Sequence, residues 1–202
     1  EIIFATAPYL RDLALRHADW LTAALEANPS ETMSAILADM KAAGTETSDD
    51  ATLMQRLRVG KARGALLSAV AEIGRVWTAR ETTRAMSDIA DAALEAALDF
   101  LMREAAQRGD LAMPAERASA AASGLAVFAL GKHGGQELNY SSDIDIVVFY
   151  DPTLAVLPED ADHNKFYVRI VRRLVSIMQD RTADGYVFRT DVRLRPDPGS
   201  TP

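Results

Sequence analysis

The 202-residue chain contains no cysteine, and this absence limits the chemistry that it can carry out. Without cysteine the protein has no disulfide framework, no thiolate zinc site and no cysteine nucleophile. The same absence fits a reducing compartment, so we expect a cytoplasmic protein. No apolar run approaches the ~18 residues that a membrane-spanning helix needs, and residues 1–4 contain no basic segment. We therefore expect neither a membrane anchor nor a signal peptide.

Basic residues are in the minority, since 22 lysines and arginines stand against 29 aspartates and glutamates and the formal net charge is −7. A protein that binds nucleic acid along its surface normally presents a basic face to the phosphates, so this balance argues against nucleic acid as a partner. A single nucleotide stays compatible, because a bound metal ion can supply positive charge. Hydrophobic residues make up 49% and charged residues 25% of the chain, as in an ordinary soluble globular protein.

The first 110 residues have the composition and periodicity of a helical bundle. Alanine and leucine dominate, and apolar residues recur at helical spacing over residues 10–25 and 86–101. Residues 78–81, Thr-Ala-Arg-Glu, form a capping-box pattern ahead of the second stretch, while Gly44 marks a candidate helix end. We predict four or five helices in this part of the chain, each with one buried face.

The texture changes after a turn at residues 109–114. Short apolar runs that predict buried strands follow at residues 124–130, 144–150 and 186–194. The alanines of the first run leave a helix open there. A helical stripe over residues 166–178 separates the second and third runs. We therefore predict an α+β fold, with a helical subdomain over residues 1–110 and a mixed sheet with flanking helices over residues 111–202.

A glycine-rich turn and two aspartates lie between the first two predicted strands. The chain carries, in order, Gly131, Lys132, His133, Gly134 and Gly135, then Ser141, Ser142, Asp143, Ile144 and Asp145. Side chains two residues apart on a strand point to the same face, so Asp143 and Asp145 can converge on one point. Two convergent carboxylates beside a flexible turn suit a hard cation, such as Mg²⁺, that carries phosphates.

These residues offer the groups that metal-dependent phosphoryl or nucleotidyl transfer needs. Asp143 and Asp145 would hold the metal, and Asp191 would add a third carboxylate if its strand lies beside theirs. The amides after Gly134 and Gly135 can approach phosphate closely, because no side chain intervenes. The remaining phosphate-binding candidates are Gly131, Lys132, Ser141, Ser142, Arg193 and Arg195.

Each element taken alone also has an ordinary structural explanation. A lone Asp-x-Asp is more often a solvated or capping pair than a metal site, and Asp191 alone is more simply the partner of Arg189 or Arg193. The glycine pair is compatible with a plain tight turn, and the order of a P-loop is absent. We expect His133 to be a turn residue rather than a base. Only the three carboxylates together favour a metal.

Taken together, residues 128–145 resemble the active-site signature of the glutamine synthetase adenylyltransferase family, within the DNA polymerase β-like nucleotidyltransferase superfamily. Residues 190–196 are similar to the strand that carries this family's third carboxylate, and residues 8–10 and 87–97 are similar to its helical part. The resemblance implies that residues 111–202 form a nucleotidyltransferase core, and that this core continues beyond the end of the given sequence.

The family resemblance also implies a reaction. Members carry an N-terminal domain that removes AMP from a tyrosine of glutamine synthetase by phosphorolysis, releasing ADP, and a C-terminal domain that attaches it. Residues 137–145 are similar to the adenylyl-removing version. Asp143, Asp145 and Asp191 would then hold two Mg²⁺ ions. The implied partners are glutamine synthetase, a PII-type signal protein, the adenylylating half, ADP or ATP, and phosphate. His133 departs from the family, which has leucine or another apolar residue there.

Two other functions stay open at the level of sequence. A different nucleotidyltransferase, which modifies a small molecule or another protein, would share the carboxylates but not residues 137–139 or the helical front. A non-catalytic regulatory fragment is the other alternative. The chain begins at Glu1 and ends at Pro202, so we expect a piece of a longer protein that can hold the carboxylates yet lack part of the substrate-binding surface.

Overall fold

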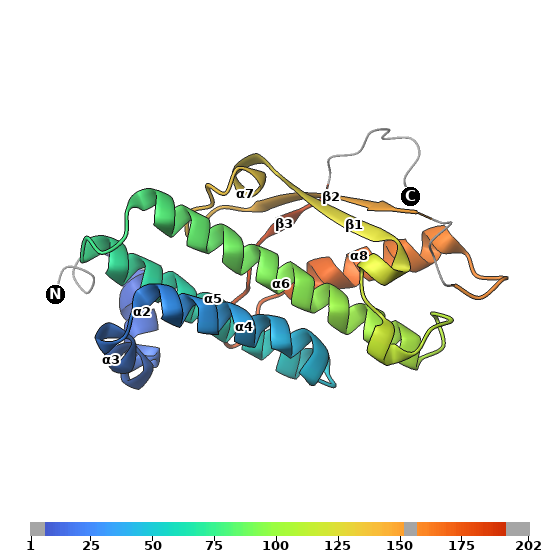
Figure 1. Ribbon diagram of the computed structural model, residues 1–202, viewed down its shortest axis with the longest axis horizontal. Helices are drawn as coiled ribbons and strands as arrows, with labels where there is room; N and C mark the ends of the chain where they lie inside the picture. Colours follow the sequence, from blue (N-terminus) through green and yellow to red (C-terminus); the bar gives the residue numbers. More distant parts are fainter. Residues whose placement is uncertain (1–6, 152–156, 193–202) are drawn as a thin grey trace.

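The computed structural model describes residues 7–151 and 157–192, which form an α+β fold (Figure 1). Five helices come first: α2 (Pro8–Arg16), α3 (Ala18–Glu26), α4 (Pro29–Glu46), α5 (Asp50–Ile73) and α6 (Ala79–Gln107). Two 3-10 turns follow, η1 (Ala115–Arg117) and η2 (Ala121–Ser123). The last elements are β1 (Leu125–Leu130), α7 (Gly131–Gly134), β2 (Ile144–Tyr150), α8 (His163–Gln179) and β3 (Thr190–Asp191). The predicted fold class is confirmed.

The long helices α4, α5 and α6 lie alongside one another, with α6 on the side of the sheet (Figure 1). Each begins at a polar cap. Asn28 and Asp49 accept backbone amides of the first turns of α4 and α5, and Thr78 with Glu81 forms the predicted capping box of α6. The described residues contain no helix that is long and apolar enough to cross a membrane.

The predicted stripe over residues 10–25 is not one continuous helical face. The helix is interrupted at His17, between the end of α2 and the start of α3, and α3 runs in a new direction. Leu13 is therefore buried, whereas Leu25 is 62% exposed. The prediction of one buried face through Leu25 was wrong, because helical spacing keeps residues on one face only while the helix axis continues.

Gly44 lies inside α4 and does not end it, so that prediction was also wrong. A Cβ at this position would lie 2.5 Å from the carbonyl oxygen and 2.8 Å from the Cα of Ala96 on α6. The glycine is required because the two helix backbones cross closely there. Small residues on both sides of a crossing are what allow such an approach.

We expect Gly44→Ala to lower the free energy of unfolding by about 2 kcal/mol, within the ~1–3 kcal/mol typical of overpacking a core. Gly60→Ala on α5 is the matched control. Its new Cβ would meet Cγ of Met40 at 2.4 Å, and this flexible side chain can move aside. Urea unfolding of the two variants measures the difference. Equal losses would show that the backbone contact at Ala96 is not limiting.

The sheet has the strand order β1-β2-β3, with an antiparallel first pair and a parallel second pair. Leu130 lies opposite Asp145 in the first pair, and Asp145 lies opposite Asp191 in the second. The inner face of the sheet rests on α6 and α8 (Figure 1). Its buried side chains on β1 and β2 are Leu125, Ile144 and Ile146. Because strand residues alternate between faces, Asp145 points to the outer face.

The third strand begins later than the sequence predicted. The predicted strand began at residue 186, but the amides of Val187 and Phe188 both donate to the carbonyl oxygen of Met178 at the end of α8, at 2.9 and 3.1 Å. Pairing with β2 begins only at Thr190. The apolar pattern over residues 186–188 thus reflects burial against a helix end. Residues 193 and 194, which the prediction included, lie outside the described residues.

Arg58 of α5 joins the helical part to the segment that leads into β3. Its side chain is 1% exposed and donates to the carbonyl oxygens of Ile177, Asp180 and Gly185 at 3.2, 2.5 and 2.9 Å. Burial lowers the pKa of Arg58, although a guanidinium stays protonated in proteins. Buried apolar residues of both parts form one continuous cluster. The domain boundary after residue 110 stays a prediction.

Candidate active site

Asp145 and Asp191 occupy paired positions on the parallel strands β2 and β3. Side chains at paired positions of neighbouring strands point to the same face of a sheet, so the two carboxylates lie side by side on the outer face. Both residues are partly exposed. The strand that carries Asp191 thus lies beside the strand that carries Asp145. The predicted site required this arrangement for Asp191 to join the other carboxylates.

Asp143, one residue ahead of β2, makes a different contact. Its Oδ1 lies 2.6 Å from Nε of Arg189, and Nη2 of Arg189 donates to the carbonyl oxygen of Ser141 at 3.3 Å. Both charged side chains are more than half exposed, and ion pairs of this kind contribute at most ~1 kcal/mol. Asp143 can therefore exchange Arg189 for another cation at little cost.

The carboxylates are not gathered as tightly as metal ligands. Over residues 7–151 and 157–192, no group of three or more histidine, aspartate or glutamate side chains is placed to hold a metal ion. The structure brings Asp145 and Asp191 together and turns Asp143 toward Arg189. Carboxylate oxygens are nevertheless the donors that Mg²⁺ prefers, so the chemistry of this set fits that ion. The three-carboxylate metal site stays a prediction.

The glycine turn lies directly against Asp145. Gly131, the first residue after β1, has φ +56°, and a Cβ there would lie 3.0 Å from Oδ2 of Asp145. Glycine is favoured by the left-handed backbone, and it leaves the space beside the carboxylate open. At Gly134 a Cβ would lie 2.4 Å from the carbonyl oxygen of Ala129, so this glycine is needed to fold the turn back onto β1. The amide of Gly135 donates to the Gly131 carbonyl oxygen at 3.0 Å.

The other predicted phosphate-binding residues have mixed surroundings. Lys132 is exposed and makes no ion pair with any residue that the structure describes. The hydroxyl of Ser142 donates to Oδ1 of Asn139 at 2.6 Å and thereby stabilises the turn ahead of β2. Ser141 is exposed and offers its carbonyl oxygen to Arg189. The predicted sites Arg193 and Arg195 lie outside the described residues.

His133 contributes more to the structure than the sequence suggested. The side chain is buried, and its Nε2 lies 2.7 Å from Oδ1 of Asp91 on α6. Further along the same loop, the amide of the buried Leu138 donates to Oγ of Ser87, also on α6, at 3.3 Å. One helix therefore holds the loop between β1 and β2 at two points. Asp91 and Ser87 belong to residues 87–97, the helical segment that resembled the family. That resemblance was the sequence signal that could have pointed to these two contacts.

We expect Asp91→Ala to destabilise the protein by about 1 kcal/mol, because it leaves a buried imidazole nitrogen without its partner. His133→Leu should cost less, since leucine removes the polar group together with its need for a partner. The double variant should match His133→Leu alone. Urea unfolding of the three variants gives the double-mutant cycle. Additive losses would show that the two side chains do not interact.

Burial raises the pKa of two groups near this loop. The Tyr140 phenol has a raised pKa, and its hydroxyl has no hydrogen-bond partner among the described residues. Burial raises the pKa of Asp88; the nearby Arg84 lowers this pKa in part, and the charge of Asp91 raises it by a smaller amount. Because Tyr140 stays protonated at neutral pH, we assign it no role as a base.

The model of one protein family, described as glutamate-ammonia ligase adenylyltransferase, matches residues 1–202. The chain belongs to this family. The family resemblance that the sequence suggested is therefore confirmed. The family is named for an adenylyltransferase, which is a nucleotidyltransferase.

Relatives of this family member carry the name bifunctional glutamine synthetase adenylyltransferase/adenylyl-removing enzyme. The protein of Agrobacterium fabrum is 44% identical over 203 residues, that of Rhizobium meliloti 46% identical over 209 and that of Caulobacter vibrioides 44% identical over 200. These alignments cover 98%, 98% and 99% of this chain but only 20%, 21% and 20% of the relatives. The chain therefore spans about a fifth of their length.

Proposed function

We propose that this chain belongs to the adenylyl-removing half of a bifunctional enzyme and carries the carboxylates for phosphorolysis of adenylylated glutamine synthetase. The observation that carries the proposal is the pairing of Asp145 with Asp191 beside Gly131. Further support comes from the likeness of residues 137–145 to the adenylyl-removing version of the domain, and from relatives whose name includes that activity.

In this proposal Asp145, Asp191 and Asp143 hold Mg²⁺, two ions in all. Bound Mg²⁺ supplies positive charge that offsets the charge of the reacting phosphates. If Asp143 held the metal in place of Arg189, the Arg189 guanidinium would be free to bind a phosphate oxygen. Lys132 stands at the adjoining turn as a second cation. The bare backbone at Gly131 keeps the space beside Asp145 open for phosphate.

The reaction is a displacement at phosphorus. An oxygen of inorganic phosphate forms a bond to the adenylyl phosphorus, and the bond from that phosphorus to the tyrosine oxygen breaks. The products are ADP and a tyrosine oxygen that takes up a proton. Such a reaction depends mainly on positioning and charge neutralisation by the enzyme. Glutamine synthetase is the protein substrate, and a PII-type signal protein and the adenylylating half are the proposed regulatory partners in the cytoplasm.

The test is incubation of the chain with adenylylated glutamine synthetase, inorganic phosphate and Mg²⁺, with chromatographic detection of nucleotide. We expect ADP to appear as AMP leaves the synthetase, and both changes to stop when phosphate is omitted or EDTA is added. Release of AMP would identify hydrolysis instead. Transfer of label from ATP to unmodified synthetase would identify the attaching reaction. Either result would contradict the proposal.

A further inference from the structure

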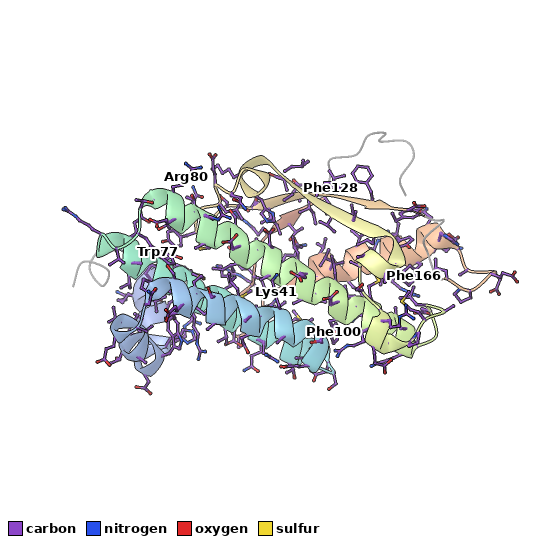
Figure 2. All side chains as sticks on the ribbon, in the orientation of Figure 1. Lys41, Trp77, Arg80, Phe100, Phe128 and Phe166 are labelled. Atoms are coloured by element: carbon purple, nitrogen blue, oxygen red, sulfur yellow. The ribbon has the colours of Figure 1, made fainter. Side chains whose placement is uncertain are left out.

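An exposed aromatic pair lies on the outer face of the sheet, on the same face as the carboxylates. Phe128 of β1 is 56% exposed and Phe149 of β2 is 51% exposed. Their ring centroids are 5.8 Å apart with an interplanar angle of 79°. Figure 2 shows Phe128 on the side of the sheet away from α6. Exposed aromatic rings grouped in this way commonly mark a binding surface.

The position of the aromatic pair relative to the carboxylates follows from the strand register. Leu130 lies opposite Asp145, and Phe128 lies opposite Val147. Phe128 is therefore two residues along β1 from the position that faces Asp145, which is about 7 Å at the usual strand rise. In a nucleotide the ribose separates the phosphate from the base by a comparable length. A nucleotide whose phosphate lies at Asp145 can therefore reach Phe128 with its base.

We propose that Phe128 and Phe149 form the surface on which the purine base of the adenylyl group stacks. This inference rests on the function proposed above, because it takes the phosphate to lie at Asp145 and Asp191. The outward-facing side chains of β1 are Ala126, Phe128 and Leu130, none of which is charged. An uncharged aromatic base suits this surface, and a stack on aromatic rings holds a base without hydrogen bonds to its edge.

The size of the patch favours a base over a protein partner. A fully buried aromatic side chain contributes about 150–250 Å², so two half-exposed rings and Leu130 offer roughly 300 Å². A stable protein interface needs about 800 Å² on each side. A purine base covers two rings, so the patch matches the smaller ligand.

The test compares three probes in the presence of Mg²⁺: ADP, ribose 5-phosphate, which lacks the base, and inorganic phosphate. We expect Phe128→Ala and Phe149→Ala each to weaken ADP binding about tenfold, the scale of one lost base–aromatic stack. Binding of ribose 5-phosphate and phosphate should not change. Phe128→Tyr should bind ADP as the parent does, because it keeps the ring. Isothermal titration measures all three probes.

The matched control is Leu25→Ala, which also removes an exposed apolar side chain but lies on α3, outside the sheet. Each outcome has a distinct meaning. If the parent chain binds none of the probes, the proposed function itself fails. If the parent binds ADP and both phenylalanine variants bind it equally well, only the base-stacking inference fails. If the phenylalanine variants lost ribose 5-phosphate binding as strongly as ADP binding, the rings would be supporting the sheet and the inference would also fail. It would fail as well if the parent chain were a dimer and Phe128→Ala made it monomeric, because the rings would then form a protein interface.

Discussion

Replacing Asp143 and Asp145 together with asparagine is expected to abolish Mg²⁺-dependent release of ADP from adenylylated glutamine synthetase. We expect a loss of at least about 10³-fold, the upper part of the range for removing one group that stabilises charge in a transition state. Asparagine keeps the shape of aspartate but removes the charge that holds a divalent cation. The measurement is the initial rate of ADP formation at saturating phosphate.

The fold should survive this change, because Asp143 is exposed and Asp145 is only partly buried. The double variant loses only the exposed ion pair between Asp143 and Arg189, so its melting temperature should stay close to that of the parent. Mg²⁺ should raise the melting temperature of the parent and not that of the variant. Asp160→Asn, an exposed change ahead of α8, is the control and should keep full activity. Undiminished turnover in the double variant would remove the carboxylates from the mechanism.

Arg58→Met is expected to cost about 3 kcal/mol of stability. Methionine retains most of the apolar stem but removes the donors to the carbonyl groups of Ile177, Asp180 and Gly185, of which the Ile177 contact is buried and the other two are partly buried. Each such group costs ~1–3 kcal/mol, and part of the loss is recovered where water reaches the site. Urea unfolding, with the slope compared between parent and variant, measures the effect.

The neighbouring Arg56 on α5 provides the control. Its guanidinium pairs with Asp39 and Glu46, both at 2.7 Å, but these carboxylates are 61% exposed. Arg56→Met should therefore cost less than about 1 kcal/mol, as is usual for surface ion pairs. If the two arginine variants lose the same stability, the buried carbonyl contacts of Arg58 do not account for its role.

The sequence predicted the parts of the fold in which local pattern and burial agree. β1 ends at Leu130, just ahead of Gly131, and β2 ends at Tyr150, just ahead of Asp151 and a proline, and both runs were found within about a residue of their ends. The α8 stripe was found for the same reason, because its apolar positions keep one period along an unbroken helix axis. The apolar run over residues 144–150 placed Asp145 on β2 and Asp143 just ahead of that strand.

The sequence could not predict contacts that depend on how distant elements meet. Gly44 looked like a helix end, because the sequence does not show that the backbone of Ala96 packs closely against it. His133 looked like a turn residue because Asp91, its partner, lies on a different element. Arg58 carried no signal, since a single arginine on a helix is usually exposed.

The pairing of β2 with β3 holds the two carboxylates together, and this pairing can open locally without unfolding the rest of the protein. On the β3 side of β2, Thr190 and Asp191 are the paired residues in the part of the chain that the structure describes, while Val187 and Phe188 are anchored ahead of them on the end of α8. Fraying can therefore separate Asp191 from Asp145 without opening the buried cluster beneath. Hydrogen exchange at the amide of Ile144, which donates to Arg189, should then be faster than in the centre of β2. Assembly of the carboxylate pair is a local equilibrium, and any ligand that bridges both aspartates raises its population.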